Sequence, residues 1–217
     1  MKDLIIASIG IHALEMAEIV ERINRVTPTW SLLGFLTRDG QDRGARTIHG
    51  HDILGTVKDV QRYPDCWFAI DNERPVDLPD GRVTNIVDPT AFVSRTARMG
   101  AGCVIYPHCY IGANAILGDR VFALAGAVIN HDDHLEDDVI LCTNVSLAGS
   151  VHVEAGCYLG QACTVRQLLR IGRNSLVGMG SVVVRDVPPE CVVAGNPARI
   201  LRPNRKASST DNLTHVE

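Results

Sequence analysis

The stretch IYPHCYIGANAILGDRVFALAGAVINHDDHL, residues 105–135, carries an apolar residue at its first position and at every sixth position after it. Followed in both directions, this series runs from Val87 to Val183 without a slip in register, and all seventeen of its members are apolar. In a chain with 46% hydrophobic residues, chance would produce such a series with a probability of about 10⁻⁵. The period of six is therefore a structural repeat.

A second, smaller position follows each member of the series by four residues. It is Ala, Cys, Val or Ser in fifteen of the seventeen repeats, and only Asp133 and Leu169 depart. A period of six fits neither an α-helix nor a single strand. Three such hexads predict one turn of a triangular coil, in which both positions point inward and residues eighteen apart stack. Successive coils then bury one another, as in other repeat proteins.

The composition agrees with a narrow coil, because aromatic residues make up only 5% of the chain. Four of the seven cysteines, at 103, 109, 157 and 163, occupy the small inward position, so we interpret them as small buried hydrophobes. An odd number of cysteines without a CxxC pair excludes a fully paired disulfide scaffold and argues against a zinc knuckle. The net charge of −4 has the wrong sign for a nucleic-acid-binding surface.

Neither a membrane span nor a leader is predicted. The longest uncharged stretch, Met99 to Gly118, is interrupted by Pro107, His108 and several glycines. The apolar run Leu4–Ala13 is short for a signal peptide and has no cleavage-like motif after it. We therefore expect a cytoplasmic protein.

The repeat resembles that of the hexapeptide-repeat acyltransferases. The ending Asp186–Pro189, DVPP, followed by AGNPA at 194–198, is similar to the usual exit of that family from its prism. The resemblance covers about residues 86–203 and implies an all-β left-handed parallel β-helix for this part. The tail, residues 204–217, is polar, and we expect it to be flexible.

Residues 1–80 lack the repeat and predict a small α/β unit. A buried strand is expected at Asp3–Ala7, and Met16, Ile19, Val20 and Ile23 have the spacing of an amphipathic helix. Further strands are expected at 30–36 and 67–70, and Pro75, Pro79 and Gly81 predict a linker. The predicted fold class is thus an α/β, Rossmann-like N-terminal domain followed by the β-helix.

An α/β unit ahead of a hexapeptide prism resembles the bacterial sugar acetyltransferases, which include nucleotide-linked 4-amino-sugar N-acetyltransferases and sialic acid O-acetyltransferases. By position, the resemblance implies a sugar-nucleotide site lined by Gly10, Ile11, His12, Thr37, Arg38 and Asp71. The chain departs from the subfamily at Ser8 and Ile11, usually Gly, at Thr37 and Arg38, often acids, and at Asp71, often Gly. From the residues alone, the turn at 8–13 is equally an ordinary strand-to-helix turn, because it holds only one glycine of a GxGxxG pattern.

The hexad Ile129–His134, INHDDH, is where the repeat carries its only charged inward residue, Asp133. Gly149 lies eighteen residues after His131 and is expected to stack beside it. A histidine next to a carboxylate and facing a small residue suits a general base, although from the residues alone a solvated corner is the favoured alternative. The family resemblance places the catalytic base and its acidic partner at His131 and Asp132, and it implies that the Gly149 amide holds the thioester oxygen.

By the same positional resemblance, acetyl-CoA would contact Ile140, Gln161 and Met179. The subfamily often has His in place of Ile140 and Asn in place of Leu124. His134 is a second candidate base, whereas His49, His51, His108, His152 and His215 are expected at the surface or in turns. The three-histidine zinc pattern of carbonic anhydrases on this prism is not matched, so no metal is predicted.

The sequence therefore predicts an acetyl-CoA-dependent sugar acetyltransferase, with His131 as the general base and a nucleotide-linked amino sugar as the acceptor. Glycan or lipopolysaccharide biosynthesis is the expected setting, and the family resemblance implies a homotrimer. Two alternatives remain open at this stage. One is O-acetylation of sialic acid or another sugar, and the other is a non-catalytic binding or scaffold protein on a degenerate acyltransferase fold.

Overall fold

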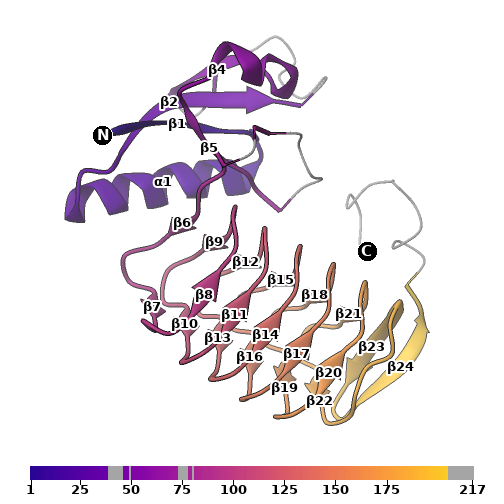
Figure 1. Ribbon diagram of the computed structural model, residues 1–217. Coiled ribbons are helices and arrows are strands. Elements are labelled where there is room, and N and C mark those ends of the chain that lie inside the picture. The colour runs from indigo at the N-terminus through magenta and orange to yellow at the C-terminus, as the bar shows by residue number, and fades with distance from the viewer. Residues whose placement is uncertain (39–45, 49, 73–77, 80, 205–217) are drawn as a thin grey trace.

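The computed structural model describes residues 1–38, 46–48, 50–72, 78–79 and 81–204. A small sheet with one long helix sits over one end of a ladder of short strands that coils toward the C-terminal part of the chain (Figure 1).

The N-terminal sheet has five strands in the order β3-β4-β2-β1-β5, all parallel except for the β3–β4 pair. Successive side chains of β1 point to opposite faces of the sheet, as the pleat of a strand requires. Leu4 and Ile6 join the core under helix α1, while Ile5 packs with Val60 of the 3₁₀ helix η1. The elements are β1 (Lys2–Ile6), α1 (Ile11–Val26), β2 (Trp30–Thr37), β3 (Thr47–Ile48), β4 (His51–Thr56), η1 (Val57–Arg62) and β5 (Trp67–Ala69).

The strands and the helix expected in this unit are confirmed, since Met16, Ile19 and Val20 bury the apolar face of α1. The Rossmann-like character expected for it is not confirmed: the described residues hold one α-helix and one short 3₁₀ helix, which is less than a doubly wound layer needs. Pro75 lies outside the described residues. The segment after Gly81 extends the sheet, because the amide of Phe68 donates to Arg82 O at 2.8 Å and the amide of Thr84 donates to Phe68 O at 2.9 Å.

Seventeen two-residue strands follow, and each ends on a member of the six-residue series. They are β6 (Ile86–Val87), β7 (Phe92–Val93), β8 (Arg98–Met99), β9 (Val104–Ile105), β10 (Tyr110–Ile111), β11 (Ile116–Leu117), β12 (Phe122–Ala123), β13 (Val128–Ile129), β14 (His134–Leu135), β15 (Ile140–Leu141), β16 (Ser146–Leu147), β17 (His152–Val153), β18 (Tyr158–Leu159), β19 (Thr164–Val165), β20 (Arg170–Ile171), β21 (Leu176–Val177) and β22 (Val182–Val183).

Each strand pairs in parallel with the strand eighteen residues away, as in Tyr110↔Val128 and Ile111↔Ile129. The result is a left-handed parallel β-solenoid with a six-stranded, a five-stranded and an eight-stranded face. The eight-stranded face is completed by β23 (Cys191–Gly195), parallel to β21, and by the antiparallel β24 (Ala198–Pro203). Asn204, the first residue of the expected tail, bonds Glu190 and Asn174, and residues 205–217 lie outside the described part.

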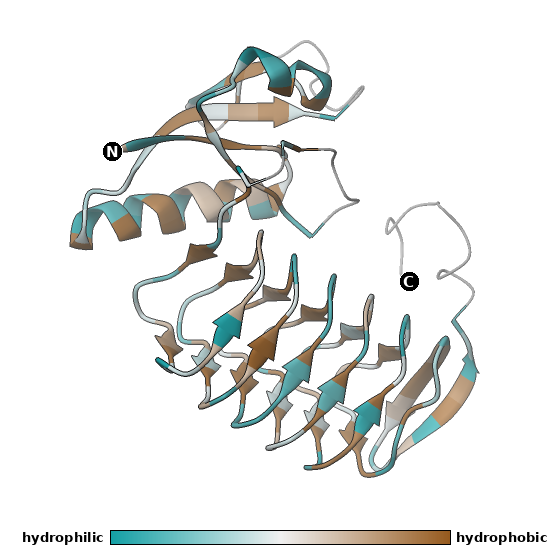
Figure 2. Cartoon of the chain, in the orientation of Figure 1, coloured by the Kyte–Doolittle hydropathy of each residue, from teal (hydrophilic) through white to brown (hydrophobic). Residues whose placement is uncertain are grey.

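The interior of the solenoid is the predicted aliphatic ladder. Fourteen of the seventeen series positions are buried, and the three half-buried ones, Val87, Val93 and Met99, belong to the first coil. Brown, apolar segments recur along the coil, whereas several strands, such as β8 and β14, and many corners carry teal (Figure 2). The four inward cysteines are buried and free, and burial raises the pKa of Cys103 to about 11 and of Cys157 to about 12. They act as hydrophobes at neutral pH.

Helix α1 joins the two parts of the molecule. It packs on the first strands of the eight-stranded face, where Ile86, Val104 and Phe122 are buried. Arg22 forms a two-pronged ion pair with the buried carboxylate of Asp88, with Nε–Oδ2 at 2.6 Å and Nη2–Oδ1 at 3.1 Å. The N-terminal unit is therefore attached to the solenoid by both apolar packing and a partly exposed ion pair.

No helix within the described residues is long and apolar enough to cross a membrane. A cytoplasmic location stays a prediction.

Candidate active site

His131 lies on a corner of the solenoid, directly after β13. The corner turns through Asp132, whose φ of 59° is left-handed, and the amide of Asp132 donates to Ala113 O at 2.9 Å. The next corner repeats this arrangement, with Ser150 at φ 61° and its amide donating to His131 O at 3.0 Å. The sequence period thus stacks the two corners and fixes the backbone of His131 between its neighbours.

The imidazole of His131 is paired with the adjacent carboxylate. Nδ1 of His131 lies 2.8 Å from Oδ2 of Asp132, and Asn114 Nδ2 donates to Asp132 Oδ1 at 3.1 Å. The hydrogen bond from His131, and then that from Asn114, hold the pKa of Asp132 below its usual value. An ionised carboxylate accepts the Nδ1 proton, which leaves the lone pair on Nε2. The His131 side chain is largely exposed, and Nε2 is its ring nitrogen without a hydrogen-bond partner among the described residues.

Gly149 provides the space that the ring occupies. A Cβ at this position would lie 2.5 Å from both Cε1 and Nε2 of His131, so any other residue would displace the imidazole. The Gly149 amide has no hydrogen-bond partner among the described residues. The structure therefore brings together the three residues that the sequence analysis assigned to the chemistry, His131, Asp132 and Gly149.

Asp133 is the buried member of the same corner. Its side chain is fully buried, and its two oxygens accept the amides of Asn130 at 2.7 Å and Val151 at 2.8 Å. Burial raises the pKa of this carboxyl to about 7, although the two amide donors and His131 oppose the rise. A buried carboxylate needs either solvent or a hydrogen-bond partner, and here the partners are backbone amides from two successive coils, for which the sequence carries no signal.

The residues predicted to bind a sugar nucleotide gather at the carboxyl ends of β1, β2 and β5, where parallel sheets bind ligands. Ser8 Oγ donates to Asp71 Oδ2 and accepts the amide of Gly10 at 3.3 Å. Arg38 lies 3.5 Å from Asp71 Oδ1, and Thr37 donates to Gly55 O at 3.3 Å. The side chains of Ser8, Thr37 and Asp71 are buried here, whereas Ile11 is exposed.

His12 points toward the solenoid. Its Nδ1 is 3.1 Å from Glu15 and 3.2 Å from the hydroxyl of Tyr106, and its ring packs edge-on against Phe122. Tyr106 also donates to Glu15 at 2.9 Å. Burial, followed by the charge of Glu15, raises the pKa of Tyr106. The sequence analysis missed Glu15 and Tyr106; the spacing of His12 and Glu15 on a helix was a usable signal for the first, and nothing local marked the second.

The three residues expected at acetyl-CoA lie in two places on the solenoid. Gln161 and Met179 occupy successive corners, joined by the amide of Gly180 donating to Gln161 O at 2.8 Å, and Met179 is exposed. Ile140 lies on the eight-stranded face between Phe122 and Tyr158. The hydrogen bonds of His131 and Asp132 join neither group.

His134, the second candidate base, belongs to the five-stranded face. Its ring stacks on His152 at 4.8 Å, and His152 bonds Glu136 at 2.8 Å. His134 thus has no acidic partner comparable to Asp132 within the described residues. The described residues also contain no cluster of three potential metal ligands.

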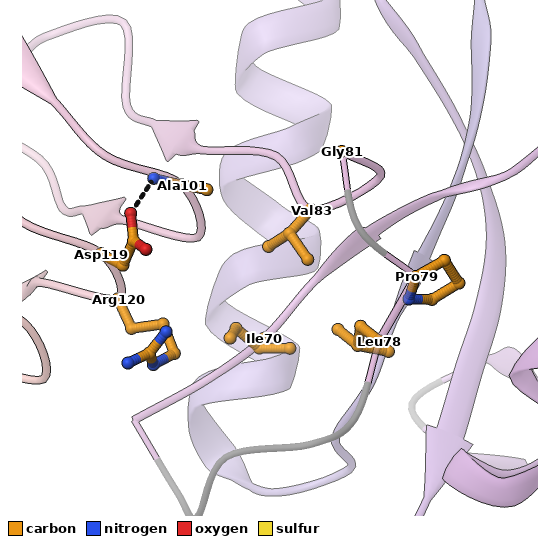
Figure 3. Close-up of a pocket in the computed structure, with 8 residues that line it drawn as sticks. All are labelled: Ile70, Leu78, Pro79, Gly81, Val83, Ala101, Asp119 and Arg120. Carbon is orange, nitrogen blue, oxygen red and sulfur yellow. Dashed lines mark hydrogen bonds between the residues drawn. The ribbon is translucent and has the colours of Figure 1, made fainter.

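The surface formed by the described residues includes two hollows. One, of about 410 Å³, is lined by Ala148, Arg166, Gln167 and Leu168, next to Gly149 along the same column of corners. The other, of about 340 Å³, lies between the N-terminal unit and the first coils (Figure 3). Its polar side chains are already engaged, because Asp119 accepts the amide of Ala101 and Arg120 pairs with Asp138.

Known proteins that are similar to this chain include acyltransferases, and no family model matches the chain. An acyl-[acyl-carrier-protein]–UDP-N-acetylglucosamine O-acyltransferase from Synechocystis is 38% identical over 111 residues, which is 49% of this chain and 40% of that protein. The enzyme of the same name from Pseudomonas aeruginosa is 42% identical over 86 residues, 40% of this chain and 33% of that protein. The chain thus spans about 40% or less of the length of these curated relatives.

Solved structures match nearly the whole chain. The acetyltransferase domain of PglB from Neisseria gonorrhoeae, bound to acetyl coenzyme A, has a TM-score of 0.79 at 23% identity and covers 92% of this chain and 99% of its own. A variant of GDP-perosamine N-acetyltransferase from Caulobacter crescentus, bound to CoA and GDP-perosamine, has a TM-score of 0.78 at 25% identity, with 93% and 97% coverage. The predicted resemblance to hexapeptide-repeat acyltransferases is confirmed at the level of the fold, and the curated relatives and these structural neighbours are acyltransferases or acetyltransferases.

Proposed function

We propose that this chain is an acetyl-CoA-dependent acetyltransferase that acts on a sugar, and that its acceptor is a nucleotide-linked amino sugar. The observation that carries the proposal is the pairing of His131 with Asp132 on a corner where Gly149 leaves room for the imidazole. The overall likeness to an acetyltransferase domain bound to acetyl coenzyme A and to a GDP-perosamine N-acetyltransferase bound to CoA and GDP-perosamine supports it.

The chemistry follows from the dyad. Nε2 of His131 takes a proton from the neutral amine as its nitrogen attacks the thioester carbonyl, and Asp132 stabilises the imidazolium that forms. Negative charge builds on the carbonyl oxygen, where the free amide of Gly149 is a suitable donor. The C–S bond then breaks, the acetyl group stays on nitrogen, and the CoA thiolate takes up the proton from His131. No acyl-enzyme is needed.

For acetyl-CoA, we propose a site that uses Ile140, Gln161 and Met179 and the hollow beside Gly149. The exposed Met179 offers an apolar surface for the pantetheine arm, and Arg166 in the hollow offers a positive charge for phosphate. Ile140 brings no polar contact of its own.

For the acceptor, we propose residues 1–80 as the sugar-nucleotide unit and residues 86–203 as the acyltransferase unit. Gly10, Ile11, His12, Thr37, Arg38 and Asp71 would line the acceptor site at the carboxyl ends of the parallel strands. The hydrogen bonds of His12 to Glu15 and Tyr106 give it a role in holding the wall of that site.

We further propose that the active protein is a homotrimer with each site between two copies. Within one chain, the hydrogen bonds of the His131 corner involve only residues of the solenoid. In the proposed trimer, the N-terminal unit of a second copy would bring the acceptor to His131. Closed symmetric assemblies of this kind are common among homo-oligomers.

A second candidate function is acyl transfer to a hydroxyl. The observation that favours it is the 38% identity to O-acyltransferases whose names specify an acyl-carrier-protein donor and UDP-N-acetylglucosamine. A hydroxyl acceptor lacks the amine titration that an N-acetyltransferase shows, because only an unprotonated amine attacks.

The test is a panel of acceptors and donors with products identified by mass. Acetyl-CoA is offered with UDP-, dTDP- and GDP-linked amino sugars and with sialic acid, and acyl carrier protein loaded with acyl chains is offered with UDP-N-acetylglucosamine. Transfer to one amino sugar supports the proposal, and transfer only to a hydroxyl supports the second candidate. No transfer and no acetyl-CoA binding by calorimetry would leave a scaffold protein on an acyltransferase fold.

A further inference from the structure

The regular ladder of the solenoid is interrupted at the corner that carries His131. After β7, β10, β16 and β19 of the six-stranded face, the residue that follows the strand donates its amide to the next coil, as Gly112 does to Ile129 O at 2.8 Å and Ala148 to Val165 O at 3.0 Å. The equivalent amide, that of Asn130, donates instead to Asp133 Oδ2 at 2.7 Å. The side chain of Asn130 takes over the carbonyl of Leu147 at 2.7 Å. Accordingly, β13 and β16 pair at one position only.

The carboxylate of Asp133 bridges two corners. One oxygen accepts the amide of Asn130, which immediately precedes His131, and the other accepts the amide of Val151, which ends the corner that holds Gly149. Three other inward-facing polar side chains in the solenoid each accept one backbone amide from a later segment of the coil: Asn85 from Cys103 at 2.8 Å, Ser175 from Cys191 at 3.2 Å and Ser181 from Gly195 at 3.2 Å. Asp133 differs from all three because it also accepts an amide of its own corner.

This bridge holds the corner of His131 at a fixed distance from the corner of Gly149. The imidazole of His131 lies against Gly149, and the two residues belong to the two corners that Asp133 joins. The link from Ser150 to His131 O at 3.0 Å closes the same contact from the other side. A loss of either amide bond would allow the corner to shift relative to Gly149.

Burial of the Asp133 carboxylate also lowers the free energy of unfolding of the protein. A buried carboxylate without a positive partner loses hydration that two amide donors only partly replace. Ala115 and Val151, the preceding and following members of the same inward column, are apolar and fully or almost fully buried, so the fold itself does not need a charge there. A costly group at the corner of the base is expected where geometry, and not stability, is required.

We propose that Asp133 is a positioning residue for His131: its buried carboxylate clamps the corner of His131 to the corner of Gly149 and so sets the imidazole in its working place. This inference rests on the proposed function for its kinetic consequences, but the positioning itself is a property of the folded chain.

The kinetic test compares Asp133→Asn with Ser175→Ala as a matched control. Both variants remove a buried acceptor of a backbone amide, but Ser175 lies away from the dyad. At a temperature at which both variants are folded, we expect Asp133→Asn to lower kcat about 10- to 100-fold, with KM values within about twofold of the wild type because the binding surfaces are untouched. Ser175→Ala should leave kcat unchanged. A folded Asp133→Asn protein with the wild-type kcat would overturn the proposal.

A second measurement does not depend on activity. The nuclear Overhauser effect between the imidazole Hε1 of His131 and the Hα protons of Gly149 should be present in the wild type and in Ser175→Ala and weakened in Asp133→Asn. If Asp133→Asn does not fold, Asp133→Ser replaces it, since a hydroxyl can accept one amide as Ser175 does. An unchanged effect in the substituted protein would refute the clamp. A His131→Ala enzyme with full activity would instead refute the proposed function and leave this result standing.

Discussion

At the scale of single residues, the proposed site depends on the absence of a side chain at residue 149. Gly149 has no Cβ, and the imidazole of His131 occupies the space where one would lie, 2.5 Å from two ring atoms. Contacts of that length force a displacement, and the ring is the movable partner because its side chain is 65% exposed. The position of the His131 imidazole is thus set by a neighbour eighteen residues away as well as by Asp132.

Gly149→Ala should therefore lower the rate of acetyl transfer about 100-fold, because a displacement of about 1 Å at a catalytic group has an effect of that size. The solenoid should remain folded, since the corner is at the surface. Ala113→Ser, which adds an atom at an exposed corner of the same column, is the control and should be fully active. The measurement is the initial rate of product formation, with circular dichroism to confirm that both variants are folded. Equal rates for Gly149→Ala and Ala113→Ser would contradict the predicted effect of a side chain at residue 149.

Asp133 should make the stability of the protein depend on pH. Its pKa rises on folding from an ordinary 3.8 to about 7, so between these values the folded state binds more protons than the unfolded state. The free energy of unfolding should then fall as pH rises from 4 to 7, by at most about 4 kcal/mol at about 1.4 kcal/mol for each pKa unit. The difference in unfolding free energy between the wild type and Asp133→Asn, measured with denaturant at several pH values, isolates this contribution. A difference that stays constant over that range would exclude it.

The same residues show how much of the candidate site could be predicted from the sequence. The stacking of His131 with Gly149 followed from the period alone, because an eighteen-residue turn places the two in one column. The partners of Asp133 did not, since backbone amides carry no sequence signal. The contacts of His12 with Tyr106 and Phe122 depend on how the N-terminal unit docks on the solenoid, which no local pattern encodes.

At the scale of elements, the solenoid was predictable because every strand obeys one rule. Each two-residue strand ends on an apolar residue at a spacing of six, so sequence register and spatial register coincide. The N-terminal sheet follows no such period. Its individual strands and helix were visible from hydrophobic patterns, but their order and the number of covering helices depend on tertiary packing, and the Rossmann-like expectation was not confirmed for that reason.

The docking of α1 gives a prediction at this scale. Arg22→Ala should lower the midpoint of thermal unfolding by several degrees, because it leaves the fully buried carboxylate of Asp88 without its cation. Arg25→Ala on the same helix is the matched control. Arg25 is 76% exposed and lies 3.6 Å from Glu21, and exposed pairs of this kind contribute little. Scanning calorimetry compares the two, and equal midpoints would show that the ion pair does not hold the helix on the solenoid.

At the scale of the whole molecule, exposed aromatic side chains bear on the proposed assembly into a homotrimer. Aromatic side chains remain exposed on the six-stranded face, where Phe92 and Tyr110 stack at 5.0 Å, and Tyr158 is partly exposed on the eight-stranded face. Burial of such side chains between subunits is favourable, and it agrees with assembly through the flat faces.

Light scattering coupled to gel filtration should therefore give a particle of three times the 23.6 kDa of one chain, about 71 kDa. Phe92→Glu places a charge on the exposed stack and should shift the mass toward one chain, with a parallel loss of transferase activity. A monomeric wild type with full activity would refute a site shared between copies.

The proposed role of His131 as the base of an acetyl transfer is tested by the rate of product formation by His131→Ala beside His134→Ala. The two histidines are three residues apart in the same hexad, but only His131 has a carboxylate partner and Gly149 beside it. With the acceptor identified by the panel, mass detection should show a loss of about 10²- to 10⁴-fold for His131→Ala and the wild-type rate for His134→Ala. Transfer at the wild-type rate by His131→Ala would show that His131 is not the base.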